Sequence, residues 1–99
     1  MHCLTVTYPA PKDTSRFKAY YEATHVPLAK TLPGLKSCSF AYPQGLGPAA
    51  APFCIFQAWF EDDAAMFAAL QSEIGKKVAA DVPNYSPDGA TLFHFPAGA

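Results

Sequence analysis

The chain has 99 residues, of which 51% are hydrophobic and only 15% are charged, and its net charge is −1. This length fits a single domain over residues 1–99, and without a basic run the sequence offers no footprint for nucleic acid. No apolar run approaches the roughly 18 residues that a membrane span needs, and no signal-peptide pattern opens the chain, so we expect a cytoplasmic protein.

The first predicted strand covers residues 1–8. Its side chains alternate between two faces and include several β-branched residues, which is typical of a strand. Pro9 and Pro11 end it. Asp13 or Thr14 is then placed to cap a helix by accepting a free backbone N–H.

The helix that follows has an apolar face and an interruption. Four residues share the face at helical spacing, with Tyr20 and His25 at its flanks: Phe17, Tyr21, Thr24 and Leu28. Pro27 has no N–H and disfavours a helical conformation at Val26. We therefore expect the helix to end near Thr24 and a short turn to restart at Pro27, before the stop at residues 32–34. His25 would lie at the break, beside a freed carbonyl.

The middle of the sequence contains two predicted strands, residues 36–43 and residues 53–60. Residues 44–52 between them are rich in Gly, Pro and Ala, which indicates a mobile loop. The second strand is apolar on both faces except at Gln57. This pattern predicts a central strand that is covered on both sides.

A second helical segment follows this strand. Residues 61–63 place negative charge at its start, where the helix dipole favours it. Ser72 and Gly75 are expected to divide the segment in two. Asp81, near its end, is expected to cap the next turn, although it could instead orient a histidine or hold a cation. The apolar stripe consists of Met66, Phe67, Leu70, Ile74 and Val78.

Residues 84–89 have turn composition, and residues 90–95 form the last predicted strand. The order strand, helix, strand, strand, helix, strand is the split βαβ pattern of the α+β ferredoxin-like fold, a four-stranded antiparallel sheet with helices on one face. The other face is then bare, and the chain has more apolar residues than a small monomer easily buries. We expect that face to pack against a second copy, making a homodimer.

Several of these positions together resemble the EthD family of the dimeric α+β barrel superfamily. The residues that carry the resemblance are Tyr8, Phe17, Tyr21, His25, Pro27, Leu32, Pro33, Gly34, Leu35, Trp59, Phe60 and Asp81. The resemblance implies a small homodimer with a pocket between sheet and helices, faced by His25. The family is linked to degradation of ethers and aromatics, to isomerisation of methyl-substituted muconolactones and to polyketide anthrone processing.

His25 is the main candidate for chemistry. The unperturbed pKa of an imidazole lies near neutral pH, so His25 can act as a general acid or base; the alternative is that it only caps a helix end. Tyr21, one turn earlier, and Tyr8, at a strand end, can donate hydrogen bonds to an oxyanion. The alternative for the tyrosines, including Tyr20 and Tyr42, is a core role with the hydroxyl at the surface.

Six residues are predicted to line a substrate pocket: Phe17, Thr24, Ser39, Phe56, Gln57 and Trp59. Buried polar groups need partners, which a ligand, a water or a neighbouring strand can supply. The aromatic members can equally fill the core. His2 and His94 fit a cavity wall or a sheet edge equally well.

The three cysteines form an odd set in apolar stretches, and we expect reduced thiols that act as small hydrophobic residues: Cys3, Cys38 and Cys54. No cluster has the spacing of metal ligands, and no Gly-rich loop leads from a strand into a helix. We therefore expect neither a metal nor a cofactor.

These features predict a cofactor-independent enzyme, of an isomerase, cyclase, decarboxylase or monooxygenase-like type, that acts by proton transfer on a hydrophobic ring compound. Such an enzyme needs a cavity beside His25. A non-catalytic dimeric accessory protein for a hydrophobic ligand needs the same cavity but no proton transfer. A purely structural dimer module needs neither.

Overall fold

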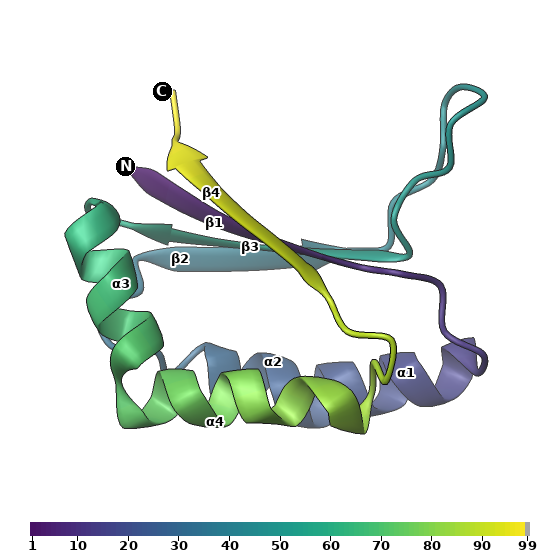
Figure 1. Ribbon diagram of the computed structural model, residues 1–99, viewed down its shortest axis with the longest axis horizontal. Coiled ribbons are helices and arrows are strands. Elements are labelled where there is room, and N and C mark those ends of the chain that lie inside the picture. Colours follow the sequence, from purple (N-terminus) through teal and green to yellow (C-terminus); the bar gives the residue numbers. More distant parts are fainter. Residues whose placement is uncertain (99) are drawn as a thin grey trace.

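The computed structural model describes residues 1–98 as one antiparallel sheet with the helices gathered on one of its faces (Figure 1). The strands are β1 (His2–Tyr8), β2 (Ser37–Ala41), β3 (Cys54–Phe60) and β4 (Thr91–Pro96). The helices are α1 (Thr14–Tyr20), α2 (Val26–Ala29), α3 (Asp63–Gln71) and α4 (Glu73–Asp81), with a π-helical turn η1 (Tyr21–His25) and a 3-10 turn η2 (Val82–Asn84).

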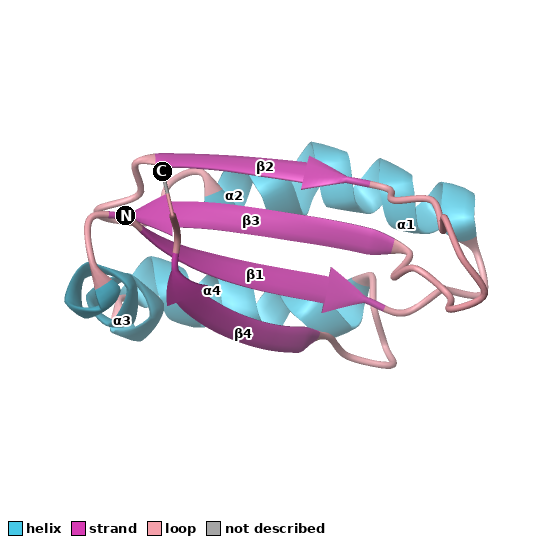
Figure 2. Cartoon of the chain, turned by 90° about the horizontal axis from the view of Figure 1, so that it is seen from above, coloured by secondary structure: helices cyan, strands magenta, loops and turns pink. Residues whose placement is uncertain are grey.

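The strands lie in the order β2-β3-β1-β4, and every neighbouring pair is antiparallel (Figure 2). This arrangement confirms the predicted ferredoxin-like class. The central strands β1 and β3 pair from His2 opposite Phe60 to Tyr8 opposite Cys54. Because side chains alternate along a strand, Leu4 and its even-numbered neighbours face the helices.

The first helical segment begins as expected but does not break. Asp13 caps α1 by accepting a hydrogen bond from the Arg16 N–H at 3.0 Å. The prediction that Val26 leaves the helical region is wrong, since its φ and ψ are −61° and −45°, and its N–H bonds to the Tyr21 carbonyl. The turn before Pro27 widens into a π turn instead. This wider turn accommodates the proline, whose ring would crowd the preceding helical carbonyl.

The π turn also changes which side chains are buried. It adds about one residue to a turn, so His25 and Val26 point into the core while Thr24 is exposed. The expectation that Thr24 shares the buried face with Tyr21 is therefore wrong. The sequence predicts His25 at the end of a helix, beside a freed carbonyl. The structure places it inside a continuous helical segment instead.

The second helical segment turns sharply at Ser72, as predicted. The Ser72 hydroxyl donates to the Ala69 carbonyl at 2.6 Å and accepts from the Gly75 N–H at 3.0 Å. A side-chain carbon at Gly75 would collide with the carbonyls of Ala69 and Leu70, so only glycine fits this corner. The predicted single stripe does not persist, since Phe67 is 44% exposed while Met66, its neighbour on α3, is fully buried.

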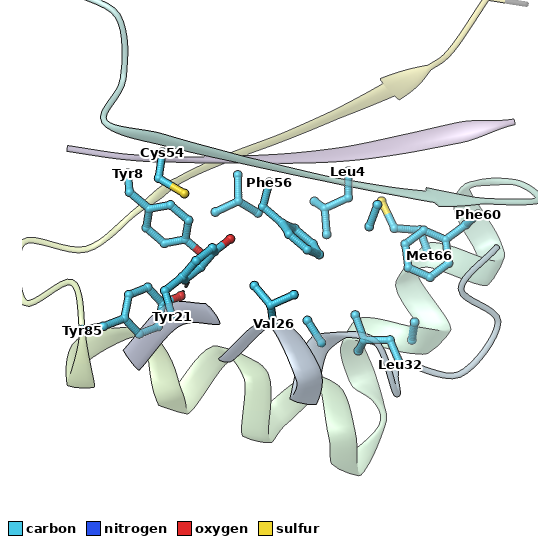
Figure 3. Packing of buried hydrophobic residues seen from close by; sticks show 14 of the residues in the cluster. Leu4, Tyr8, Tyr21, Val26, Leu32, Cys54, Phe56, Phe60, Met66 and Tyr85 are labelled. Carbon is cyan, nitrogen blue, oxygen red and sulfur yellow. Dashed lines mark hydrogen bonds between the residues drawn. The ribbon is translucent and has the colours of Figure 1, made fainter. Parts of the chain in front are cut away.

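The core between sheet and helices has two chemically different ends (Figure 3). The apolar end consists of Leu4, Leu32, Phe60 and Met66. The tyrosine end consists of Tyr8, Phe17, Tyr21 and Tyr85, together with Cys54. The tyrosine end is the only one of the two that carries hydroxyl groups within the described residues.

The sheet face opposite the helices is uncovered. Phe93 and Phe95 of β4 lie on this free face and are 47% and 37% exposed. The connection between β2 and β3 projects beyond the sheet on the side away from the helices (Figure 1), and Leu46 in it is fully exposed. None of the helices within residues 1–98 has the length and apolar character needed to cross a bilayer.

Candidate functional site

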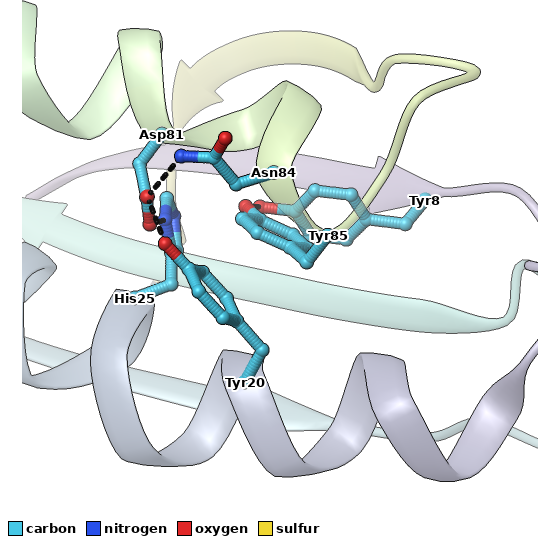
Figure 4. A network of polar contacts seen from close by, with 6 residues as sticks. All are labelled: Tyr8, Tyr20, His25, Asp81, Asn84 and Tyr85. Carbon is cyan, nitrogen blue, oxygen red and sulfur yellow. Dashed lines mark hydrogen bonds and ion pairs between the residues drawn. The ribbon is translucent and has the colours of Figure 1, made fainter.

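A histidine–aspartate pair lies where the first helical segment meets the end of α4 (Figure 4). His25 Nδ1 is 2.9 Å from Asp81 Oδ2, and the His25 and Asp81 side chains are only 4% and 11% exposed. The π turn points His25 inward, and Asp81 is the last residue of α4. The two residues, far apart in sequence, are therefore brought together by the packing of the two helical segments.

Asp81 accepts two further hydrogen bonds. The Tyr20 hydroxyl donates to Asp81 Oδ1 at 2.6 Å, and the Asn84 amide donates to the same oxygen at 3.0 Å. Burial raises the pKa of Asp81, but the donors Tyr20, Asn84 and His25 outweigh it and hold the pKa below its ordinary value. The preference for Asp81 as a cap of the next turn is wrong, since its side chain makes no capping bond to η2. The other alternative, that it orients a histidine, matches the geometry.

His25 is buried enough to stay neutral. Burial lowers its pKa below 6.5, and the hydrogen bond with Asp81 opposes this only in part. Beside an ionised Asp81, a neutral His25 carries its proton on Nδ1 and donates it to the carboxylate. The second ring nitrogen, Nε2, then carries a lone pair and has no hydrogen-bond partner within residues 1–98. A neutral imidazole held in this way is suited to accept a proton.

Aromatic rings surround His25. The Tyr21 ring stacks on the imidazole with centroids 5.5 Å apart, and the Tyr85 ring lies 4.6 Å from it. The Tyr8 and Tyr85 hydroxyls hydrogen-bond to each other at 2.8 Å. Burial raises the pKa of Tyr8 to about 12, against the lowering effect of the bond with Tyr85. These phenols are therefore protonated at neutral pH and available as donors.

The Tyr21 hydroxyl differs from its neighbours. Tyr21 is fully buried, and its hydroxyl makes no hydrogen bond of good geometry within the described part of the chain, although the Cys54 thiol and the Tyr8 hydroxyl lie close enough to be weak partners. Burial raises its pKa far above the ordinary value of a phenol. An unpaired buried hydroxyl costs about 1–3 kcal/mol, which packing alone does not explain.

The expected cavity beside His25 is not found among residues 1–98: a cavity of about 380 Å³ lies next to this cluster, but His25 is not among the residues that line it. Its buried lining residues are Phe17, Tyr85 and Ser86, and Pro9, Lys12 and Arg16 are among its exposed ones. His25 itself is 3% exposed. Tyr85 both lines the cavity and contacts the His25 ring, so it separates the two.

The structure brings together only part of the predicted pocket. Phe17 contacts Tyr21 at 5.3 Å between ring centroids and lines the cavity, and Phe56 lies in the same core. The residues that do not join His25 are Thr24, Ser39, Gln57 and Trp59.

Strand geometry explains three of these exclusions. Gln57 and Trp59 alternate with the core-facing Phe56 on β3, and Ser39 pairs with Gln57 across β2. All three therefore point to the free face, and the sheet separates them from His25. Gln57 Nε2 donates to the Thr5 hydroxyl at 3.3 Å on the neighbouring strand, which was the alternative to a ligand contact.

The remaining candidates lie elsewhere. The Tyr42 hydroxyl donates to Glu22 at 2.7 Å at the surface, and His2 Nε2 lies 2.8 Å from His94 Nδ1. Burial raises the pKa of the Cys54 thiol to about 11, which fits a small hydrophobic residue rather than a nucleophile. Within residues 1–98, no group of three or more His, Cys, Asp or Glu residues is placed to hold a metal ion.

Sequence reasoning missed Tyr85 and Asn84. Both lie in a stretch of polar and proline residues that indicates a turn, and such a stretch does not suggest a buried aromatic side chain. A lone tyrosine between Asn84 and Ser86 was the available signal, because a bulky ring in a turn must be buried somewhere.

Comparison with known proteins agrees with the fold and identifies the family. Residues 10–88 match the EthD domain. An 11.0 kDa uncharacterised protein of Rhodococcus erythropolis, from the thcB–thcC intergenic region, is 31% identical over 93 residues, or 93% of this chain and 90% of that protein. A crystal structure of an EthD family protein from Bacillus halodurans superposes with a TM-score of 0.91 at 22% identity, over 99% of both chains.

More distant structures share the fold alone. A dimeric ferredoxin-like protein of unknown function from Thermobifida fusca has a TM-score of 0.70 at 14% identity, over 97% of this chain and 89% of that one. SnoaB, a cofactor-independent oxygenase from Streptomyces nogalater, has a TM-score of 0.67 at 14% identity, over 99% and 93%. With the match covering most of its length, the chain belongs to the EthD family.

Proposed function

We propose that this protein is a cofactor-independent enzyme that moves a proton on a hydrophobic ring compound, with His25 as the base. The observation that carries the proposal is the His25–Asp81 pair: the imidazole is buried and neutral, its Nδ1–H is fixed by a carboxylate, and its Nε2 is left without a partner among residues 1–98. Two neighbouring titratable groups whose surroundings shift their pKa values, so that one is charged and the other neutral, are typical of acid–base catalysis.

The chemistry follows from these roles. His25 Nε2 takes a proton from a carbon next to a carbonyl, and the electrons of that C–H bond move to the carbonyl oxygen to form an enolate. Tyr21, or Tyr8 as second donor, stabilises the developing oxyanion with its hydroxyl. Protonated His25 then returns the proton to a different carbon, which completes an isomerisation. Phe17 and Phe56 keep water from the reacting centre.

The resemblance to the EthD family supports a ring compound of aromatic, ether or polyketide metabolism as the substrate. The fold relative SnoaB is a cofactor-independent oxygenase, which supports a reaction driven by protein side chains. Three free cysteines fit action in a reducing, cytoplasmic compartment.

We also propose a homodimer through the free face. Phe93 and Phe95 expose apolar surface there, and Trp59 and Ile55 lie on the same face. A fold relative from Thermobifida fusca is dimeric. A second copy placed on this face by a two-fold axis covers both sheets.

Solvent exchange at carbon tests the proposal before any product is identified. Ring lactones and cyclic ketones are incubated with the protein in D2O, and loss of the α-proton signal is followed by NMR. We expect exchange by the wild type and a loss of about 10²–10⁴-fold in His25→Gln. Lys76→Gln, an exposed change on α4, is the control and should leave the rate unchanged.

The rival function is an accessory protein that binds a hydrophobic ligand without altering it. The position of the 380 Å³ cavity favours this rival, because a ligand held there touches Phe17 and Tyr85 but not His25. A ligand that binds equally well to wild type and His25→Gln, with no exchange in either, would support the rival and contradict the enzyme.

A further inference from the structure

We propose that Tyr85 occupies the place of the substrate ring, and that the substrates are planar rings of about phenol size bearing a hydroxyl or oxo group, which bind by displacing Tyr85. This inference rests on the proposed function, because it names the substrate class of the same site. The ligand enters from the 380 Å³ cavity and pushes the Tyr85 ring away from His25.

The surroundings of Tyr85 are those that an aromatic substrate would require. The ring is 5% exposed and lies 4.6 Å from the His25 ring, between centroids. It lies 5.2 Å from both Tyr21 and Phe17, and its hydroxyl bonds to Tyr8 at 2.8 Å. A phenol ring thus rests against the proposed base with its oxygen on a proposed oxyanion donor (Figure 4).

The second observation is the Tyr21 hydroxyl beneath Tyr85. It is completely buried and makes no hydrogen bond of good geometry in the described residues, with only the Cys54 thiol and the Tyr8 hydroxyl as weak neighbours, although its ring contacts both Tyr85 and His25. Buried polar atoms are almost always paired, and an exception calls for an explanation. A ligand oxygen that Tyr85 does not reproduce would supply the missing partner.

The backbone of the segment that carries Tyr85, residues 82–89, makes hydrogen bonds mainly within the segment. The N–H groups of Tyr85 and Ser86 donate to the Val82 carbonyl at 3.2 and 2.8 Å, and the Gly89 N–H donates to the Ser86 carbonyl at 2.9 Å. Gly89 has a φ of +87°, which only glycine adopts readily. These backbone bonds join residues 82–89 to each other, and the hydrogen bonds from the segment to the rest of the chain run through the Tyr85 and Asn84 side chains, to Tyr8 and Asp81. The segment can therefore move without breaking a backbone hydrogen bond of the sheet.

The cavity gives a ligand a route to the Tyr85 ring. Its volume of about 380 Å³ falls in the range of small-molecule sites, roughly 300–1,000 Å³. Phe17 and Tyr85 line it and also contact Tyr21. A ring that enters the cavity therefore meets Tyr85 before it can reach Tyr21 or His25.

Affinity for 4-methylphenol, which reproduces the tyrosine side chain, tests the displacement. If the ring replaces Tyr85, the Tyr85→Ala variant binds it about tenfold or more tightly than wild type, because binding no longer waits for an open state that is roughly 0.1–10% populated. If the ring stays in the outer cavity, the variant loses a wall and binds equally or more weakly, which overturns the inference. Tyr42→Ala, a tyrosine change outside the cavity, should leave the affinity unchanged.

A measurement on the unmodified protein covers the case in which Tyr85→Ala does not fold. Backbone amide exchange of residues 85–89 is compared with and without saturating 4-methylphenol. Displacement predicts faster exchange, because the segment opens as the ring enters. Unchanged or slower exchange at these amides would contradict displacement.

The same variants separate this inference from the proposed function. His25→Gln should retain ring binding and abolish proton exchange at carbon. A wild type that binds the ring by displacement but never exchanges carbon protons would refute the enzyme and leave the ligand class standing. A wild type that exchanges carbon protons without opening residues 85–89 would refute displacement alone.

Discussion

The two ends of the core use the same architecture for different purposes. At the apolar end, Phe60 and Met66 are fully buried and carry no polar atom that needs a partner. At the tyrosine end, the hydroxyls of Tyr8, Tyr21 and Tyr85 are brought into the interior, and one of them stays unpaired among the described residues. The comparison teaches that the apolar end supplies stability, while the tyrosine end retains polar groups at a cost that the proposed ligand site would explain.

The largest effect is expected at the apolar end. Phe60→Ala removes a completely buried ring, and loss of buried area plus the remaining cavity should lower the free energy of unfolding by about 3–5 kcal/mol. Urea denaturation measures this. Leu46→Ala, at a fully exposed position, should change it by less than about 0.5 kcal/mol. A small loss in Phe60→Ala would remove the stabilising role given to this end.

The next effect concerns Asp81. Asp81→Ala leaves the donors Tyr20, His25 and Asn84 without their acceptor, so we expect a loss of about 2–3 kcal/mol in the same measurement. Glu22→Ala removes only the exposed bond from Tyr42 and should cost less than about 1 kcal/mol. Equal losses in the two variants would show that the histidine–aspartate pair is no stronger than a surface contact.

Two phenol-to-phenyl changes should act with opposite signs. Tyr8→Phe breaks the bond with Tyr85 and should lower stability by about 1 kcal/mol. Tyr21→Phe removes an unpaired hydroxyl and should leave stability unchanged or raise it by about 1 kcal/mol. Thermal unfolding of both variants beside wild type decides this. A clear loss in Tyr21→Phe would mean that its hydroxyl already has a partner.

A further effect appears with pH. The folded protein keeps His25 neutral below the ordinary pKa of 6.5, whereas the unfolded chain takes up a proton there, so stability falls as pH drops from about 6.5. Asp81 adds a second loss that begins near 3.8, because the folded carboxylate resists protonation.

The difference between wild type and His25→Gln in unfolding experiments from pH 8 to 5 isolates the first step, since His2 and His94 are common to both proteins. We expect the difference to slope by at most about 1.4 kcal/mol per pH unit. A flat difference would contradict the lowered pKa of His25.

Much of the fold was predictable because local signals agreed. Alternation in the strands, the Asp13 cap and the Ser72 corner each specified a boundary that the structure confirms. The π turn was not predictable, because proline rules describe a helix that breaks and not one that widens. That single turn decided that His25, and not Thr24, faces the core.

The site was predictable only in part. His25, Tyr21 and Tyr8 were named from the residues, and the structure places Tyr21 against His25 and against Tyr8. Asp81 lies 56 positions from His25, and no local pattern shows which side chain a distant carboxylate will meet. Tyr85 depended on how a turn folds back over the core, which sequence periodicity does not encode.

The most direct test of the account is the protonation state of His25, read from the ring nitrogens by NMR of protein with ¹⁵N-labelled histidine. Signals that disappear in His25→Gln identify the residue. We expect that at pH 7 the proton is on Nδ1, that Nε2 is unprotonated, and that Nε2 takes up a proton only below pH 6.5. A proton on Nε2 at pH 7, or a fully protonated ring at that pH, would contradict the role of His25 as a poised base.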